Sequence, residues 1–450
     1  MPSCGLSLLE EVGLSARRII GFACNQAFVF YLLFMGASWT TARFDLLFTM
    51  LFMVVGFGVV RLLGSARFER LFARPLLYVY AVLSAAGSLL SFVAPDGGIA
   101  VAAVQGLFVG VPSAFLLTAW GRSFGRVKTQ GAVPEVFLGS LIGALVCLVF
   151  SFAPVSGIVF LAVRLLPIAS VVNIEMGDGG RAQSGAKAQA GDGQVRVLSL
   201  KILAGTLLFG MAAGSMLMYR VSPGEYYQVS IVLYGAFLVG GLSLLLSDGF
   251  GRGAALNKSY RLAVFVMMVG VLLVPWPMMA ESVLPGEAVV LAGFLGLEVV
   301  LISLFLVLAE ITGTDCALSF SSGFAALFAG GIIGALAAIA LAHTTYLIVV
   351  LAGVIILLSY IFLFTERDFD ALSQLVTESD SLEVACAEIT EKYGLSNRES
   401  EILAFALRGR TSERIAQELV ISKSTVDTHL RRIYSKCGVH SKQELIDLAE

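Results

Sequence analysis

Long apolar runs alternate with short polar segments along most of the chain. Each run holds about twenty residues, enough for one α-helix to cross roughly 30 Å of hydrocarbon. A helix is required because lipid offers no water to the backbone polar groups. Twelve runs are predicted to span a membrane. They lie near 19–39, 44–63, 75–94, 97–119, 134–153 and 154–173, and near 198–219, 228–247, 261–280, 287–309, 318–341 and 344–364.

A polar stretch divides these runs into two sets of six. The segment EMGDGGRAQSGAKAQAGDGQ at 175–194 is rich in Gly, Ala and Gln and has no apolar periodicity, as is typical of a flexible linker. The pattern therefore predicts an all-α, polytopic membrane domain over 1–365. Its six-helix halves cover about 17–174 and 198–365, and residues 175–197 link them.

Basic residues gather on one side of this layout. With the N-terminus in the cytoplasm, sixteen Lys and Arg residues of the loops and span ends lie on the cytoplasmic side, and two, Arg43 and Arg220, lie on the other. Membrane proteins place their excess of basic residues in cytoplasmic loops. Because the number of spans is even, the C-terminus is predicted to return to the cytoplasm.

Composition agrees with a membrane protein and excludes several classes of site. Charged residues make up 14% and mean hydropathy is +0.89, whereas soluble domains are about a quarter charged. The six Cys form no CxxC pair, and the three His are not clustered with Cys or carboxylates, which argues against a metal site. Neither a Walker motif, a nucleophile–base pairing nor the βα repeats of a receiver domain occur. The sequence therefore predicts no cofactor and no enzyme.

The composition changes after Phe364. Residues 366–394 contain eight acids, two bases and no membrane-length run. Apolar positions that include Cys386, Ile389 and Tyr393 recur there at helical spacing. This acidic segment is predicted to be a connecting helix that packs against the domain after it.

Residues 395–450 are predicted to form four short helices, with capping residues at their ends. These caps are Ser396 with Glu399, Gly409, Ser422, and Ser441 with Glu444. The second helix is expected to bury Ile415, Ala416 and Leu419.

The third of these helices has two contrasting faces. Val426, Leu430, Ile433 and Cys437 recur every three or four residues and are predicted to pack inward. The opposite face carries small hydroxyls and arginines, which suit insertion into a DNA major groove. The alternative is an ordinary solvated face, which one helix in isolation would favour. The predicted DNA contacts are Lys423, Ser424, Thr425, Asp427, Thr428, Arg431, Arg432 and Lys436.

The whole segment LSNRESEILAFALRGRTSERIAQELVISKSTVDTHLRRIYSKCGVHSKQELIDL resembles the LuxR-type helix-turn-helix family. The residues that carry the match include Arg398, Glu399, Gly409, Ile415, Ala416, Leu419, Ile421, Ser422, Thr425, Val426, His429, Leu430, Ile433, Lys436 and Val439. The resemblance implies a domain that binds double-stranded DNA through its third helix, as a homodimer through its last helix. RNA polymerase is a further candidate partner.

Asp427 departs from this family, in which the residue after Thr425-Val426 is commonly basic. An acid repels phosphates, but it can accept a hydrogen bond from cytosine N4. The domain holds nine bases and eight acids, which predicts modest non-specific affinity for DNA. His429 lies beside the buried stripe and is expected to be a satisfied structural histidine rather than a catalytic one.

The membrane domain resembles the major facilitator transporters, whose two six-helix halves are structural repeats joined by a long cytoplasmic loop. The helix count and the central linker carry most of the resemblance. The segment SDGFGRG at 247–253 adds a local similarity to the family's cytoplasmic motif. Asp248, Gly251 and Arg252 fit that motif, and Gly249 stands where a basic residue is usual.

Two charged residues fall deep within predicted spans. Arg164 lies in VFLAVRLLPIA and Glu298 lies in FLGLEVVLIS. Each costs about 3 kcal/mol at the bilayer centre unless it faces a partner or a cavity. They are predicted to mark or border a ligand cavity between the halves. In a transporter-type fold span ten lines that cavity and span six is peripheral, so a direct pair of Glu298 and Arg164 is not expected. The alternative is a charge that is paired or hydrated for helix packing.

The sequence as a whole predicts a membrane-integrated, DNA-binding transcription regulator in the cytoplasmic (inner) membrane of a bacterium. The membrane domain would sense a small molecule or a membrane condition, so the expected partners are DNA, the lipid bilayer and an unidentified small-molecule ligand. The competing interpretation is a secondary transporter of the major facilitator type with a regulatory DNA-binding appendage. A coupled carrier usually needs several buried charged residues, and the two seen here favour sensing.

Overall fold

The structure, a computed structural model, describes most of the chain. The described residues are 14–35, 42–94, 97–127, 129–152, 157–175, 192–218, 227–247, 252–274, 286–341, 344–363, 368, 385–407, 409–419 and 421–449. The chain divides into two compact units. The larger unit holds the apolar helices, and the smaller unit holds Asp370–Glu450.

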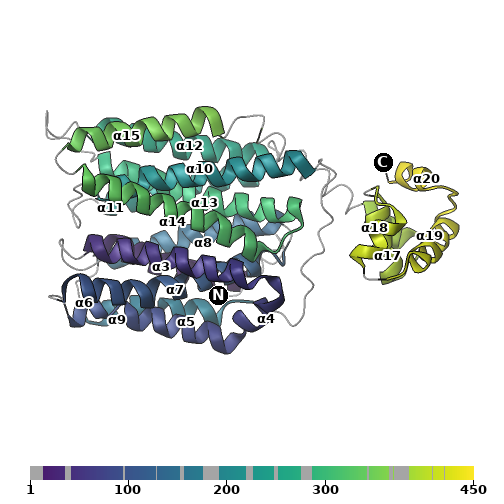
Figure 1. Ribbon diagram of the computed structural model, residues 1–450, viewed down its shortest axis with the longest axis horizontal. Coiled ribbons are helices and arrows are strands. Elements are labelled where there is room, and N and C mark those ends of the chain that lie inside the picture. The colour runs from purple at the N-terminus through teal and green to yellow at the C-terminus, as the bar shows by residue number, and fades with distance from the viewer. Residues whose placement is uncertain are drawn as a thin grey trace, which may run out of the picture. The chain divides into compact units, whose positions relative to one another are not determined.

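Long apolar helices run side by side through the larger unit (Figure 1). Its first part contains α2 (Ala16–Met35), α3 (Ala42–Leu63), η1 (Ser65–Arg67), α4 (Phe68–Leu71), α5 (Arg74–Gly87), α6 (Leu90–Val93), α7 (Gly98–Phe124), α8 (Thr129–Phe152) and α9 (Gly157–Val172). Its second part contains α10 (Asp192–Met218), α11 (Tyr227–Leu246), α12 (Arg252–Leu273), α13 (Gly286–Thr312), α14 (Cys316–Ala340), α15 (Thr345–Leu358) and η3 (Ser359–Leu363).

Eight helices among the described residues are long and apolar enough to cross a membrane, namely α3, α7, α8, α10, α11, α12, α13 and α14. The helices α9 and α15 are apolar but shorter. The chain is therefore a membrane protein, all-helical in the part that the structure describes.

The helix α10 begins at Asp192, inside the segment 175–197 that composition assigns to a linker. A helix already nucleated by an apolar run gains one hydrogen bond for each residue that it adds, so it can extend into polar sequence. The end of the predicted linker is therefore helical, and residues 176–191 lie outside the described residues.

The α10 and α14 helices meet at their backbones. A β-carbon added to Gly214 of α10 would lie 2.0 Å from the carbonyl oxygen of Gly331 in α14. In the same seam, a β-carbon on Gly334 would lie 1.9 Å from the carbonyl oxygen of Met211. Small residues permit such close approach in membrane proteins, where dispersion contacts replace the hydrophobic effect as the force between helices.

The two parts of the larger unit meet along α14, which packs against α3 and α7, and along α11, which packs against α8. Phe57 of α3 stacks on Phe324 and Phe328 of α14, with ring centroids 5.9 Å and 6.2 Å apart. Apolar side chains thus form the body of this interface.

Polar contacts close one end of the same interface. The Arg122 guanidinium of α7 lies 3.4 Å from the carboxylate of Asp315, which caps α14, and 3.0 Å from Glu69. Nearby, the Arg61 guanidinium of α3 donates a hydrogen bond to the Ser322 hydroxyl of α14. One ion pair and one hydrogen bond therefore join the two parts near the start of α14.

The smaller unit contains α17 (Asn397–Leu407), α18 (Ser412–Glu418), α19 (Lys423–Cys437) and α20 (Lys442–Asp447), with residues 385–392 helical before them. One apolar core joins all of these helices. Its buried members are Cys386, Ile389, Leu395, Ile402, Leu403, Phe405, Ala406, Leu407, Ile415, Ala416, Val426, Leu430, Ile433, Cys437 and Leu445. The helical residues at 385–392 therefore contribute to the same core as α19. Residues 366, 367 and 369–384 of the predicted acidic helix lie outside the described residues.

The predicted caps of this unit are confirmed. The Ser396 backbone N–H donates to Glu399 at 2.8 Å, and the Glu399 N–H donates to the Ser396 hydroxyl at 3.4 Å, which completes a capping box. Gly409 has a positive φ of 76°. The Ser422 hydroxyl accepts from the Thr425 N–H, and the Ser441 hydroxyl accepts from the Glu444 N–H, both at 3.1 Å.

Candidate nucleic-acid interface

The α18 and α19 helices form two arms of a helix-turn-helix, and α19 is held by its inner face. Val426 and Ile433 are fully buried, and Leu430 and Cys437 are 8% and 7% exposed. From α18, Ile415 and Ala416 are buried and Leu419 is partly buried, in the same core. This packing fixes which side of α19 faces outward.

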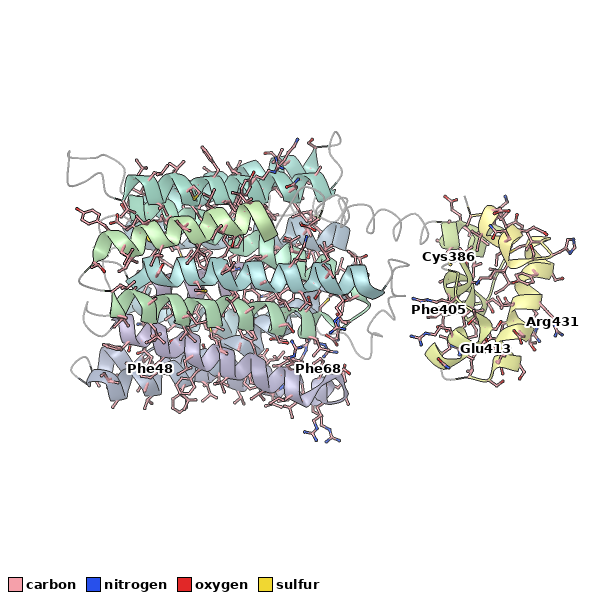
Figure 2. All side chains as sticks on the ribbon, turned by 45° about the horizontal axis from the view of Figure 1, so that its top comes forward. Phe48, Phe68, Cys386, Phe405, Glu413 and Arg431 are labelled. Carbon is pink, nitrogen blue, oxygen red and sulfur yellow. The ribbon has the colours of Figure 1, made fainter. Side chains whose placement is uncertain are left out.

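The outward face of α19 presents the predicted hydroxyls and arginines. Ser424, Thr428, Arg431 and Ser435 are exposed, and so is the flanking Arg432. Figure 2 shows Arg431 on the side of the unit away from Cys386 and Phe405. A straight helix with such a face has the shape and donor groups needed to enter a major groove.

Hydroxyl groups cluster at the N-terminus of α19. The Ser422 hydroxyl lies 2.8 Å from that of Ser424 and 2.7 Å from that of Thr425. The Thr428 hydroxyl donates to the Ser424 carbonyl at 2.8 Å. The backbone N–H groups of a helix N-terminus carry partial positive charge and bind phosphate readily. Ser424 and Thr425 therefore lie where a DNA backbone could be held.

Lys423 forms an ion pair with Glu413 of α18, and both side chains are more than half exposed. Its hydrogen bond with Glu413 is the main cause that raises the pKa of Lys423, with a small contribution from Asp427. The ammonium group is therefore charged but partly neutralised by a neighbour. Sequence spacing gave no sign of Glu413, because only the turn between the helices brings it beside Lys423.

Lys436 is held within the domain. Its ammonium lies 2.7 Å from the carboxylate of Glu399 and donates to the Gly394 carbonyl at 3.0 Å. The hydrogen bond from Lys436, together with those from Ser396, lowers the pKa of Glu399 to about 2. The Glu399 side chain is 5% exposed, so Lys436 stabilises a buried acid. The Lys436 side chain itself is 39% exposed.

Arg431 and Arg432 differ from both lysines. Within the described residues neither arginine makes an ion pair, and both are exposed. Asp427 lies on the same helix and is partly buried. The two arginines are therefore the strongest candidates for binding phosphates or guanine edges.

His429 is not a satisfied histidine in the described part of the chain. Its side chain is partly buried, and the buried Nδ1 atom has no hydrogen-bond partner there. The expectation that its ring would be hydrogen-bonded is therefore wrong.

Residues 394–449 match the family described as bacterial regulatory proteins of the luxR family. This C-terminal domain is a LuxR-type DNA-binding domain. The match covers the helix-turn-helix, the capping box at Ser396 and the last helix, which is the same region as the core of the smaller unit.

Several curated bacterial proteins are similar to the LuxR-type domain. The response regulatory protein YgeK of Escherichia coli is 41% identical over 87 residues, which are 18% of this chain and 59% of that protein. The Fimbriae Z protein of Escherichia coli is 46% identical over 56 residues, 12% of this chain and 27% of its own length. The response regulator TodT of Pseudomonas putida is 42% identical over 65 residues, 14% and 29% of the two chains. This chain thus spans less than two thirds of each relative.

The membrane part is similar in fold to solved transporters. A crystal structure of the human organic anion transporter MFSD10 (TETRAN) covers 80% of this chain and 100% of its own, with 12% identity and a TM-score of 0.52. The major facilitator superfamily transporter FucP in its outward conformation covers 81% and 97%, with 12% identity and a TM-score of 0.47. The likeness to MFSD10 shows a fold of the major facilitator type.

The structure places the two predicted membrane residues in different neighbourhoods. The Arg164 guanidinium of α9 lies over the Tyr31 ring of α2, 5.6 Å from its centroid. Glu298 of α13 is 8% exposed and lies beside Tyr234 of α11. Asp248 and Gly251 of the segment 247–253 lie outside the described residues.

Sequence analysis missed a fully buried charge. The carboxylate of Glu135, fully buried in α8, binds the Arg18 guanidinium of α2 through two contacts of 2.7 Å and 2.8 Å. Arg18 also lies 2.8 Å from Glu175. Glu135 stands second in the run predicted at 134–153, where a polar residue suggests a loop end. The number of buried charges therefore separates a sensor from a transporter less sharply than the sequence indicates.

Proposed function

We propose that this protein is a transcription regulator that binds DNA while its membrane domain remains in the bacterial cytoplasmic membrane. The observation that supports this most is the presence, in one chain, of spanning helices and a LuxR-type domain with an exposed Arg431 and Arg432 face. The chain has twelve spans in two halves, and both termini lie in the cytoplasm. The C-terminal domain is therefore on the side of the membrane that holds the chromosome.

On DNA, α19 enters the major groove. Arg431 and Arg432 contact phosphates or guanine edges, Thr428 lies between them and the helix start, and Ser424 and Thr425 hold a phosphate at the N-terminus of α19. Lys423 exchanges Glu413 for a phosphate, whereas Lys436 keeps Glu399 and supports the domain. Asp427 accepts a hydrogen bond from cytosine. The domain binds as a homodimer, and RNA polymerase is its partner at promoters.

The membrane domain acts as a sensor of a small molecule through the relative position of its halves. A ligand biases such an equilibrium only through different affinities for the two arrangements. The contacts of Arg122 with Asp315 and of Arg61 with Ser322 belong to one arrangement and break in the other. The helical residues at 385–392 carry the change onward, because Cys386 and Ile389 belong to the core that holds α19.

DNA binding by the purified full-length protein in lipid nanodiscs tests this proposal. Labelled genomic fragments are expected to bind the wild type and to bind Arg431→Ala roughly tenfold more weakly. Lys392→Ala removes one exposed positive charge from the 385–392 helix and serves as the control, with affinity close to wild type. Equal DNA affinity of the Arg431 variant and the wild type would contradict the assigned interface. Saturable transport of a substrate without DNA binding would favour a transporter with an appended domain.

A further inference from the structure

The carboxylate of Glu298 is the least compensated charge among the described residues of the membrane domain. Glu298 is 8% exposed and lies in the middle of α13, the most buried of the spanning helices. No ion pair or hydrogen bond to it is formed within the described part of the chain, in contrast to the buried Glu135, which binds Arg18. A buried carboxylate without a partner is costly, so it is neutralised either by a proton or by a cation that comes to lie beside it.

One buried hydroxyl lies near this carboxylate, and a second lies near that hydroxyl. The Tyr234 hydroxyl of α11 lies close to both Glu298 and the Ser140 hydroxyl of α8. Within the described residues neither the Tyr234 oxygen nor the Ser140 oxygen has a hydrogen-bond partner of standard geometry. Tyr234 thus connects the carboxylate of α13 with the hydroxyl of α8, and the two hydroxyls have unused hydrogen-bonding capacity.

Aromatic rings adjoin this cluster at two points. The Phe30 ring of α2 meets the Tyr234 ring edge-to-face, with centroids 5.3 Å apart. The Phe237 ring packs against α13 at Gly296, where an added β-carbon would lie 2.8 Å from the ring. Phe30 and Ser140 come from the first half and Tyr234 and Glu298 from the second, so the cluster lies where the halves meet.

The chemistry of the cluster selects among cations. An inorganic cation such as Ca²⁺ requires six or more oxygen ligands, and no group of three or more His, Cys, Asp or Glu residues occurs among the described residues. An organic cation needs one carboxylate and the faces of aromatic rings, which Glu298, Tyr234 and Phe30 supply.

We propose that Glu298, Tyr234 and Phe30 form the binding site for a lipophilic organic cation at the interface of the two halves. This inference rests on the proposed role of the membrane domain as a small-molecule sensor, and it names the class of ligand. The cation reaches Glu298 when the halves move apart, because the rings of Phe30 and Tyr234 are each 1% exposed in this arrangement. Binding of the cation then favours the arrangement in which the halves have moved apart.

Equilibrium binding of radiolabelled tetraphenylphosphonium to the full-length protein in nanodiscs tests the site. Wild type is expected to bind it saturably, and Glu298→Gln is expected to bind roughly tenfold or more weakly. Tetraphenylborate has the same shape and the opposite charge, and it should show no saturable binding. Glu287→Gln, a matched change in the first turn of α13, should bind tetraphenylphosphonium like wild type.

Three results would overturn the inference: no saturable binding of the cation by wild type, equal binding by Glu298→Gln, or equal binding of the anion. If Glu298→Gln does not fold, as judged by size-exclusion chromatography, Tyr234→Leu provides the test and should bind several-fold more weakly. DNA affinity of the same preparations separates this inference from the proposed function. Glu298-dependent binding without DNA binding supports the site and contradicts the regulator. DNA binding without any dependence of cation binding on Glu298 supports the regulator and contradicts the site.

Discussion

The ammonium of Lys436 lies 2.7 Å from the carboxylate of Glu399, and this contact joins the end of the DNA-facing helix to the start of α17. Glu399 also caps α17 through Ser396. One buried acid therefore fixes both the beginning of the domain and the position of α19.

This contact predicts a pH-dependent stability of the isolated segment 385–450, which holds the LuxR-type domain and the helix before it and has its own core. The pKa of Glu399 is lowered to about 2, against about 4.3 for an unperturbed glutamate. Its contribution is therefore complete above about pH 4.3 and lost as the pH falls towards 2. Glu399→Gln should lower the free energy of unfolding by about 2 kcal/mol at pH 7, as measured by urea denaturation.

The loss caused by Glu399→Gln should shrink as the pH falls from 4.3 towards 2, because the wild-type acid becomes protonated as well. Glu388→Gln changes an exposed acid of the 385–392 helix and should cost less than about 0.5 kcal/mol. A Glu399→Gln deficit that does not vary with pH would show that the ion pair is not its cause.

The ion pair between Lys423 and Glu413 predicts that a loss of charge can improve DNA binding. Glu413→Gln leaves the Lys423 ammonium without its acidic neighbour, so the lysine becomes available to a phosphate. Affinity for DNA should rise a few-fold, and the slope of log affinity against log salt should steepen by about 1. Fluorescence anisotropy at several salt concentrations measures both quantities. Unchanged affinity would mean that Lys423 does not reach the DNA backbone.

The contact between Arg122 and Asp315 predicts how the interface of the halves responds to a single substitution. Asp315→Asn keeps the hydrogen bond that caps α14 at Ala317 but removes the charge that attracts Arg122. Alkylation of Cys316 by N-ethylmaleimide should accelerate roughly threefold in a background in which it is the only cysteine. The same background with Glu287→Gln provides the control, and equal rates in all three proteins would contradict the role of this contact.

The close seam between α10 and α14 predicts a strong dependence of folding on one glycine. Gly214→Val would place side-chain atoms against the backbone of Gly331, whose oxygen lies 2.0 Å from an added β-carbon. Gly235→Val is a matched change in α11, because nothing lies within 4 Å of an added β-carbon there. Size-exclusion chromatography should show monodisperse protein for the α11 variant and aggregation for the α10 variant. A monodisperse Gly214 variant would show that the helices can separate.

Local patterns explain what could be predicted from the sequence. The Ser422 cap, the buried stripe from Val426 to Cys437 and the spanning helices depend on residues a few positions apart. The ion pair between Lys436 and Glu399 does not depend on nearby positions, because the two residues are separated by 37 positions. The same holds for the buried pair of Arg18 and Glu135, which lie 117 positions apart. Only the packing of helices determines such pairs.

The same distinction between local and long-range features applies to the candidate site. The exposure of Arg431 and Thr428 could be predicted, because it is set by the periodicity of α19. The separate neighbourhoods of Arg164 and Glu298 agree with the expectation, from the transporter-like order of the spans, that the two do not pair directly. Their individual neighbours could not be predicted, because a polar residue in a span gives no information on which helix it faces. The start of α10 at Asp192 was missed because a helix can extend beyond its apolar run.

Genome occupancy of the tagged full-length protein in its native cells tests the central claim most directly. The account predicts discrete peaks for the wild type in the membrane-bound fraction, and their loss in a protein that combines Thr428→Ala with Arg431→Ala. Lys392→Ala should retain the peaks. Absence of peaks in the wild type across varied growth conditions, or peaks that survive the double substitution, would contradict a regulator that binds DNA from the membrane.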